Sequence, residues 1–558
     1  MPDNKVSLPP LKKTFSMSAY LNRWHIIVLL VAVICAIPVL TVFSYIFLPA
    51  GDVWRHLTET VLSDYVINSL LLITGVSFGT LTMGISCAWL TSVYRFPGRK
   101  LFQWLLLLPM ALPAYIIAYT YTGMMDFAGP VQSHLREWFD WSYGDYWFPE
   151  IRSMWGATSM LSLVLYPYVY LLARASFLEQ SVVALEAGRS LGAGPWKCFF
   201  KIALPMARPA IITGLSLVLM ETLADYGTVQ YFGISTFTTG IFRTWFGLND
   251  SAAAAQLSTI LLIFVLLLIT LERISRKQAR YFHSSNREKK QTRITLAGKQ
   301  AWLATFICLM PILSGFVLPF LQLSQWSIET YTEMVDGDFF GLIWNSLSLA
   351  GSAAILALLL ALLLAYGQRL QNTRLIRIAV RIASMGYAIP ATVIAVGIMI
   401  PLAWIDNAVD GWLRQQFDVS SGLLLSGTLF ALMFAYMVRF LAVSVGTVEA
   451  ALGKIKHSMD DAARSLGLRP KQVLLQIHMP LMRRSLLTAV LLVFVDVLKE
   501  LPATLILRPF NFNTLAVRAY ELASDERLAD ASTAALCIVI VGIIPVILLS
   551  QSINKQKT

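Results

Sequence analysis

The chain has little charge, little cysteine and little histidine. Only 14% of its 558 residues are Asp, Glu, Lys or Arg, whereas 57% are hydrophobic and the mean hydropathy is +0.65. Soluble domains of the same total length have no need of so apolar a composition. The five cysteines and six histidines show neither H-E-x-x-H nor C-x-x-C spacing, which argues against the common zinc and redox motifs. We therefore predict no metal site of imidazole or thiolate ligands and no cofactor.

The sequence also lacks a nucleotide-binding motif. No G-x-x-x-x-G-K-[ST] occurs, because Gly298-Lys299 and Gly453-Lys454 both lack the upstream glycine and the following hydroxyl. A polytopic membrane enzyme would need a catalytic constellation, and none is found. We therefore predict that the chain is not an enzyme and does not itself hydrolyse ATP.

What the chain does have is long apolar runs separated by short charged loops. A run of about 20 apolar residues is long enough to cross the hydrocarbon core of a bilayer as a helix. The predicted fold class is therefore all-α, a polytopic membrane protein with about 12 transmembrane helices. The predicted spans are 25–48, 66–94, 101–125, 154–177, 209–233, 252–272, 301–324, 342–367, 375–404, 422–445, 485–508 and 530–551.

The distribution of charge predicts the orientation of these spans. Most of the 44 Lys and Arg residues lie in segments that share the side of the N-terminus, and most of the 32 Asp and Glu residues lie in the alternate loops. Basic loops stay in the cytoplasm, so both termini are predicted to be cytoplasmic. The net charge of +12 then reflects topology and contact with membrane lipid, and no nucleic-acid partner is predicted. The first apolar run is too long for a cleaved signal peptide and lacks a small-x-small site.

An internal repeat divides the chain into two halves. Residues 186–192 (EAGRSLG) correspond to residues 461–467 (DAARSLG), 275 positions later, and Asn68-Ser69-Leu70 corresponds to Asn345-Ser346-Leu347. Six spans return the chain to its starting side, so the copies are predicted to be parallel repeats with a pathway between them. The predicted domains are a first half (1–272), a basic cytoplasmic linker (273–300) and a second half (301–558).

Between the fourth and fifth spans of each half, the sequence predicts a pair of short helices. A glycine ends the first helix, one proline starts the second and another proline ends it. Helices this short are marginal alone in water, so they pack either on their own membrane domain or on a partner. The residues concerned are Gly192, Pro195 and Pro205 in the first copy, and Gly467, Pro470 and Pro480 in the second.

These two segments resemble the cytoplasmic signature of binding-protein-dependent ABC importer permeases, in which Glu-Ala-Ala is followed by Gly and then by Ile-x-Leu-Pro. The chain departs from it at Gly188 for Ala, Asp461 for Glu and Met479 for Leu. The resemblance implies a bacterial cytoplasmic membrane protein whose segments 186–205 and 461–480 contact two copies of a cytoplasmic ATPase. It also implies a soluble substrate-binding protein as partner. The residues that carry it are Glu186, Ala187, Gly188, Gly192, Ile202 and Pro205, then Asp461, Ala462, Ala463, Gly467, Ile477 and Pro480.

Four acidic residues fall inside predicted spans, as two pairs spaced by four at equivalent repeat positions: Glu221 with Asp225, and Asp496 with Glu500. Spacing of four places both members on one helical face. Charges within a bilayer are costly and are commonly functional, so a cation pathway is one interpretation, with Lys499 close enough in sequence to neutralise one acid. The other interpretation is purely structural pairing between helices.

A narrower resemblance concerns the cargo. Leu498 to Thr504 (LKELPAT) is similar to a segment of fused permeases for ferric iron, and Leu223 to Thr228 (LADYGT) is similar to the same group. The resemblance implies ferric iron, while thiamine, sulfate and polyamine permeases share the architecture and stay open as alternatives. An ion-coupled secondary transporter that uses the same carboxylates is the competing class. The aromatic loop 126–152 is predicted to be an interfacial belt or a receiving surface for the binding protein.

Overall fold

We describe a computed structural model of the protein over residues 23–49, 51–142, 144–179, 188, 190–277 and 293–555. Within these residues the chain is helical apart from one pair of two-residue strands. The elements of the first half are α1 (Arg23–Ser44), η2 (Tyr45–Phe47), α2 (Asp52–Thr60), α3 (Leu62–Val93), β1 (Tyr94–Arg95), α4 (Arg99–Leu105), η3 (Leu108–Ala111), α5 (Ala114–Met125), α6 (Pro130–Phe139), α7 (Met154–Glu179), α9 (Pro195–Cys198), η4 (Phe199–Ala203), α10 (Leu204–Ala224), α11 (Gly227–Tyr231), α12 (Phe237–Phe242), η5 (Arg243–Gly247) and α13 (Ser251–Lys277).

The second half begins after β2 (Ile294–Thr295), which pairs in parallel with β1. Its elements are α14 (Gly298–Ile312), η6 (Leu313–Val317), α15 (Leu318–Met334), α16 (Gly337–Leu370), α17 (Arg374–Ala383), η7 (Gly386–Ala388), α18 (Ala391–Phe417), α19 (Leu429–Leu452), α20 (His457–Ser465), α21 (Pro470–Val473), η8 (Leu474–His478), α22 (Met479–Leu498), α23 (Pro502–Leu507), α24 (Leu515–Ser524) and α25 (Leu528–Lys555).

The all-helical membrane architecture agrees with the sequence prediction, although several predicted spans are broken. Among the described residues, ten helices are long and apolar enough to cross a bilayer, and an eleventh candidate is a pair of helices bent by 90° near Pro113. The predicted span 375–404 is likewise interrupted before Pro390, between α17 and α18. Proline lacks the N–H that would continue a helix. The remaining predicted span, 485–508, corresponds to α22, which is not among these helices because it carries three charged residues, Arg483, Arg484 and Asp496.

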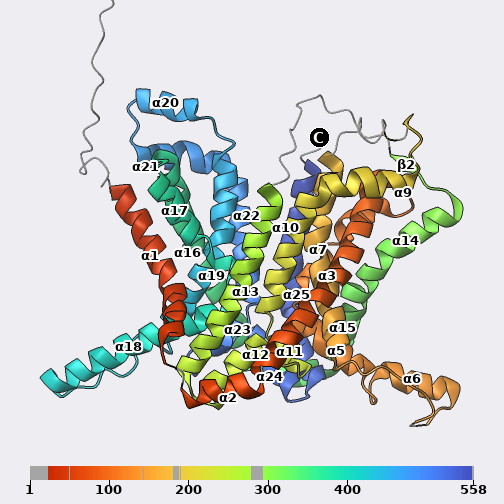
Figure 1. Ribbon diagram of the computed structural model, residues 1–558, viewed down its shortest axis with the longest axis horizontal. Coiled ribbons are helices and arrows are strands. Elements are labelled where there is room, and N and C mark those ends of the chain that lie inside the picture. Colours follow the sequence, from red (N-terminus) through yellow and green to blue (C-terminus); the bar gives the residue numbers. More distant parts are fainter. Residues whose placement is uncertain are drawn as a thin grey trace, which may run out of the picture.

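The two halves are interleaved. α1, from the first half, packs on α17 and α18 of the second, while α14 packs on α3 and α4 and α25 packs on η3. Figure 1 shows α1 beside α17 and α14 beside α3, at opposite flanks of the molecule. Arg152 of the first half pairs with Glu526 of the second at 2.8 Å. The two sequence repeats are therefore not independently packed bundles.

Small residues bring the central helices close together. α16 carries buried alanines at positions spaced by three and four, including Ala350, Ala353 and Ala357, on the face that meets α19 and α22. Small side chains at such spacing let transmembrane helices approach closely. The opposite face of α16 exposes Ile355 and Leu359, as expected for a surface that faces lipid.

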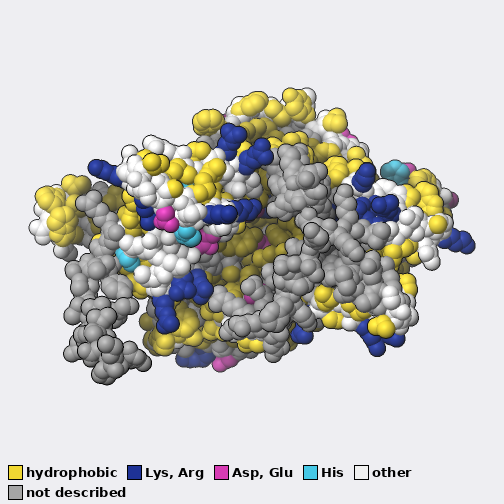
Figure 2. Space-filling model, turned by 90° about the horizontal axis from the view of Figure 1, so that it is seen from above, with side chains coloured by type: hydrophobic (Ala, Val, Ile, Leu, Met, Phe, Trp, Pro, Cys, Tyr) yellow, Lys and Arg dark blue, Asp and Glu magenta, His cyan; other side chains and the backbone are white. Residues whose placement is uncertain are grey.

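Both predicted cytoplasmic segments lie at one end of the molecule. α20 and α9 lie at the top of Figure 1, at the end where α1 begins and where the described chain ends. Seen from that end, Lys and Arg side chains are more frequent than Asp and Glu side chains (Figure 2).

Candidate functional site

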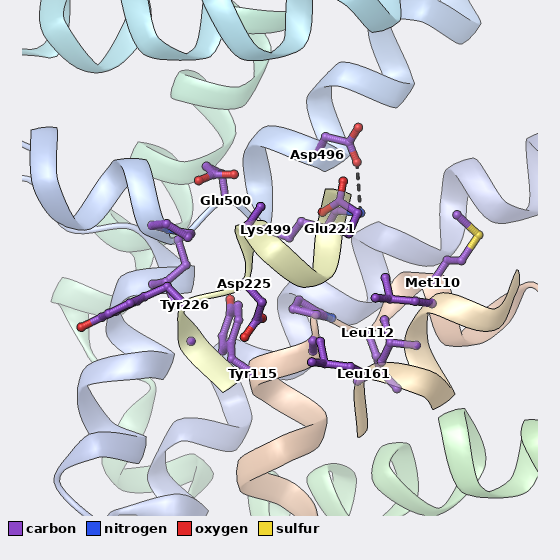
Figure 3. A pocket seen from close by; sticks show the side chains of 18 of the residues that line it. Met110, Leu112, Tyr115, Leu161, Glu221, Asp225, Tyr226, Asp496, Lys499 and Glu500 are labelled. Carbon is purple, nitrogen blue, oxygen red and sulfur yellow. Dashed lines mark ion pairs between the residues drawn. The ribbon is translucent and has the colours of Figure 1, made fainter. Parts of the chain in front are cut away.

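A cavity of about 130 Å³ lies where α10 of the first half meets α19 and α22 of the second. It is lined by 22 residues from both halves, among them all five residues predicted for a pathway. Figure 3 shows how they lie: Glu221 and Asp496 come from helices, whereas Asp225, Lys499 and Glu500 come from the segments just beyond the helix ends. The five pathway residues are Glu221, Asp225, Asp496, Lys499 and Glu500.

The helix ends are where the structure departs from the prediction. Spans 209–233 and 485–508 were expected to be continuous, but α10 ends at Ala224 and α22 ends at Leu498. Asp225 and Glu500 therefore do not lie on one helical face with Glu221 and Asp496, and the predicted i,i+4 arrangement is wrong. The cause is local hydrogen bonding. Each carboxylate accepts hydrogen bonds from backbone N–H groups at the start of the next helix, which favours a break in the chain at that residue over a continuous helix.

Asp225 and Glu500 instead cap the short helices that follow. Asp225 accepts hydrogen bonds from the backbone N–H of Thr228 and of Val229, each at 3.1 Å, and from the Thr228 hydroxyl at 3.0 Å. Glu500 accepts one from the backbone N–H of Ala503, at the repeat position of Thr228, at 3.1 Å. Capping by acids satisfies donors that a helix start leaves open, so both acids are held at the broken ends and line the cavity.

Two basic side chains neutralise part of this charge. Lys499 Nζ lies 3.0 Å from Asp496 Oδ1. Arg439, on α19, places Nε 3.5 Å from Glu500 Oε2 and Nη2 4.0 Å from Glu221 Oε2. Because Glu221 belongs to the first half and Arg439 to the second, this arginine joins the halves across the cavity.

The cavity keeps an excess of carboxylates. Four acids face two basic side chains, which leaves a formal charge of −2 when all six are ionised. Tyr115, Tyr168, Tyr226 and Tyr387 also line the cavity. Among the described residues no three His, Cys, Asp or Glu side chains are close enough to hold a metal ion. The net negative charge of the lining favours cations over anions in the cavity.

Arg439 and the tyrosines were not predicted as site residues. A signal for Arg439 was present, because it is a lone basic residue inside the predicted span 422–445, and intramembrane charges usually have a partner. No sequence signal distinguishes the four lining tyrosines from the other tyrosines of the chain. Only the packing of α5, α7 and α10 against η7 and the second half selects them.

The second cytoplasmic segment forms the helix, turn and helix that were predicted. α20 ends in a turn in which the Leu468 N–H donates to Ala463 O at 3.1 Å and the Gly467 N–H donates to Arg464 O at 2.9 Å. Gly467 has φ 84° and its repeat partner Gly192 has φ 77°, a left-handed conformation that favours glycine at helix ends. Asp461 and Ala462 are exposed, whereas Ala463 is buried.

In the first segment, Glu186 and Ala187 lie outside the described residues. Gly188 is described and buried, and a Cβ atom placed on it would overlap the side chain of Ile202. Two residues of the signature are therefore packed against each other.

The prolines at the end of each segment do not stop a helix. Pro205 and Pro480 were expected to do so, but α9, η4 and α10 follow each other without a break, as do α21, η8 and α22. η4 and η8 are π-helical turns, and each proline lies just beyond one, in the first turn of the next α-helix. Proline has no N–H to donate to the preceding turn, and the wider hydrogen-bond spacing of a π-turn lets the helix continue without that bond. Each second short helix is thus the direct start of the helix that leads to the cavity acids.

A buried ion pair ties α20 to the membrane helices. Asp460 accepts a hydrogen bond from Arg369 Nε of α16 at 2.8 Å and lies 2.8 Å from Nε2 of His478, at the end of η8. Arg369 also donates to the carbonyl oxygens of Leu452 and Ile455. Through Asp460, any displacement of α20 is passed to α16 and to η8.

The Asp460 carboxyl has a defined pH dependence. Burial alone would raise its pKa, but the hydrogen bonds from Arg369 and His478 outweigh burial and lower the pKa below 3.8. A carboxyl whose pKa is lowered by folding stabilises the folded state at any pH above its unfolded-state pKa. This stabilisation is lost as the pH falls through the folded-state pKa. We expect the difference in thermal stability between wild type and Asp460→Asn to stay constant from pH 8 to about pH 5 and to shrink only below about pH 4. A difference that vanishes near neutral pH would contradict this assignment.

Comparison with known proteins agrees with this architecture. The model of the "Binding-protein-dependent transport system inner membrane component" family matches the chain twice, over residues 80–280 and 355–557. The "Fe(3+)-transport system permease protein FbpB 2" of Haemophilus influenzae is 26% identical over 534 residues, 94% of this chain and 97% of the relative. The "Molybdenum transport system permease protein ModB" of Escherichia coli is 29% identical over 231 residues, 40% of this chain and 96% of the relative. The "Sulfate transport system permease protein CysT" of Escherichia coli is 26% identical over 205 residues, 36% of this chain and 70% of the relative. The two family matches together cover most of the chain, so it belongs to the binding-protein-dependent transport system inner membrane components, with two copies of the domain in one polypeptide.

Proposed function

We propose that this chain is the permease of an ABC importer that carries ferric iron across a bacterial cytoplasmic membrane. The observation that carries the proposal is the excess of carboxylates in the cavity between the halves. Hard cations prefer oxygen ligands, and carboxylates are the strongest of these in proteins. The relative that spans nearly the whole chain is a Fe(3+)-transport permease, which supports the same cargo.

Two of the other relatives are named for molybdenum and sulfate transport. Sulfate is an oxyanion, and a lining of four acids against two basic side chains repels it. Anionic cargo is therefore the weaker alternative for this chain. An ion-coupled secondary transporter is disfavoured by membership of a family named for its dependence on a binding protein.

The proposed partners are two copies of a cytoplasmic ATPase, which would contact segments 186–205 and 461–480. Leu191 and Leu466, which are repeat partners at the turns of these segments, are 87% and 83% exposed. Exposed apolar side chains at equivalent positions favour contact with another protein. A soluble binding protein would meet the opposite end, where Trp138 and Trp147 are exposed near α6. Both termini would then be cytoplasmic, with halves 1–272 and 301–558 joined by the linker 273–300.

Cargo identity is tested by transport in proteoliposomes that contain the permease with its ATPase and its binding protein. Radiolabelled ferric iron, molybdate, sulfate and thiamine are supplied in parallel, with and without ATP. We expect accumulation of iron alone, and only with ATP. Uptake of an oxyanion with iron at background would reject the ferric proposal, and uptake by the isolated chain without ATP would reject the importer.

Contact with the ATPase is tested by substitution of Gly192 and Gly467, the two turn glycines with a left-handed backbone conformation. A Cβ at Gly192 or Gly467 would meet no atom within 4 Å, so alanine changes only the backbone preference, at a cost of about 1–2 kcal/mol. We expect Gly192→Ala and Gly467→Ala each to lower the amount of ATPase that co-purifies. Gly446→Ala, in a helix with equally open space at its Cβ position, is the matched control and is expected to retain the ATPase. Unchanged association in both turn variants would contradict the proposed contact.

A further inference from the structure

Four arginines gather beside the first cytoplasmic segment. Arg95 and Arg99 flank the turn between β1 and α4, Arg174 lies near the end of α7, and Arg293 immediately precedes β2. The β1–β2 pairing, with Tyr94 opposite Ile294, brings the end of the linker to this turn. The hydroxyl of Tyr170, one turn before Arg174 on α7, donates to the carbonyl oxygen of Gln103, one turn after Arg99 on α4, at 3.3 Å, so α7 and α4 meet beside both arginines. We refer to these four residues as the arginine cluster.

Among the described residues, several buried donors of the arginine cluster have no hydrogen-bond partner. Arg174 is 4% exposed, and its Nε and Nη2 atoms make no hydrogen bond. Arg99 is 8% exposed; its Nε donates to the Thr91 carbonyl oxygen at 2.8 Å, but its Nη2 has no partner, and neither has Nε of Arg293. In the described part of the chain no carboxylate lies within ion-pair distance of these three side chains. Burial, with a further contribution from the charges of Arg95 and Arg174, lowers the pKa of Arg293.

In the second half, a buried arginine at the same end of the molecule has a carboxylate partner within the chain. There the basic residue at the end of α16, Arg369, is neutralised by Asp460 at 2.8 Å. The residue 275 positions before Asp460 is Leu185, which has no charge to offer. An uncompensated buried charge is strongly destabilising, and among the described residues of the first half no carboxylate compensates the arginine cluster.

We propose that the arginine cluster binds a phosphate-type oxyanion. Guanidinium groups present planar pairs of donors that match phosphate oxygens, and the unpaired atoms come from three separate segments, α4, α7 and the end of the linker. The phosphate belongs either to the head group of an anionic lipid or to a soluble phosphate.

A ligand bound to the arginine cluster would lie close to the contact between the end of the linker and the first cytoplasmic segment. A cavity of about 240 Å³ is lined on one side by Tyr94 and Ile294, from the two paired strands, and on the other by Ala193, Pro195 and Cys198 of the first cytoplasmic segment. An anion that bridges Arg99, Arg174 and Arg293 would fix the end of the linker against this segment. It would thereby take the place that Asp460 has in the second half.

Binding is tested on the purified full chain with two probes. Radiolabelled inorganic phosphate is titrated by equilibrium dialysis in detergent, and nanodiscs of phosphatidylcholine with or without phosphatidylglycerol are compared by native mass spectrometry of the retained lipid. We expect saturable binding in at least one arm, the phosphate arm indicating a soluble ligand and the phosphatidylglycerol arm a lipid. Arg174→Gln and Arg293→Gln are expected to weaken it at least about tenfold. Arg483→Gln, an exposed arginine of α22, is the control and is expected to bind as wild type does.

Thermal stability gives a second measurement that does not depend on transport. The bound probe is expected to raise the melting temperature of wild type and of Arg483→Gln but not of Arg174→Gln. If Arg174→Gln does not yield folded protein, Arg293→Gln decides, because it lies outside the helices and is partly exposed. No saturable binding in either arm, or equal binding by wild type and the cluster variant that folds, would overturn the proposal.

Discussion

Replacing Arg439 by Gln is expected to reduce ATP-driven iron uptake by about 100-fold or more. Arg439 is 8% exposed and is the side chain that reaches both Glu500 and Glu221. Without it, the buried Glu500 and the half-buried Glu221 lose the cation that they share, and removal of one partner from a buried pair costs about 3–5 kcal/mol. The variant must therefore protonate these acids or move α10 away from α19, and either change alters the cavity.

Uptake is measured in proteoliposomes with the ATPase and the binding protein, after size-exclusion chromatography has established that the variant is folded. Arg414→Gln is the matched control, because Arg414 pairs with Asp410 in the same half but its side chain is 62% exposed. Exposed pairs contribute about 0–1 kcal/mol, so this control is expected to transport normally. Adding Glu500→Gln to Arg439→Gln is expected to restore thermal stability without restoring uptake. Near-normal uptake by Arg439→Gln would remove this residue from the mechanism.

Replacing Asp460 by Asn is expected to uncouple ATP hydrolysis from transport. Arg369 and His478, which are both buried, would each lose their acidic partner, again at a cost of about 3–5 kcal/mol. Because Asp460 links α20 to α16 and η8, its loss leaves α20 free to move without moving the helix that ends at the cavity acids. We expect a lower melting temperature and ATPase activity that no longer depends on cargo.

The neighbouring residue supplies the control for this experiment. Asp461 is exposed and makes no ion pair among the described residues. Asp461→Asn is therefore expected to change the free energy of unfolding by no more than about 0.5 kcal/mol. If Asp461 contacts the ATPase as proposed, the same variant lowers the amount of ATPase that co-purifies. Identical behaviour of the two variants in both assays would contradict the division between an internal link and an external contact.

Much of the fold could be predicted from the sequence because it depends on local pattern. Apolar length sets where helices cross the bilayer, and a match of residues 186–192 to 461–467 is visible without any structure. The sequence also predicted that Gly467 ends a helix, and the structure shows Gly467 and its repeat partner Gly192 in the left-handed conformation that favours glycine there. All five predicted pathway residues do line one cavity.

The errors arise where distant parts of the chain compete with local preference. Pro205 and Pro480 read as helix stops, yet π-turns carry the helix through both. Asp225 and Glu500 read as helical neighbours of Glu221 and Asp496, yet each caps the next helix instead. Helix propensity is a property of one segment of sequence at a time. Where these helices continue and where they end depends on how both halves pack around one cavity.

A duplicated, all-helical membrane protein with equivalent segments at 186–205 and 461–480 could be predicted from the linear chain, because hydrophobic length and a repeat are visible in it. That α1 and α14 each cross to the other half, that Arg439 meets Glu221 and that Asp460 meets Arg369 could be learned only from the folded chain. These contacts join residues far apart in sequence, and their energies depend on distance and burial, which no linear pattern contains.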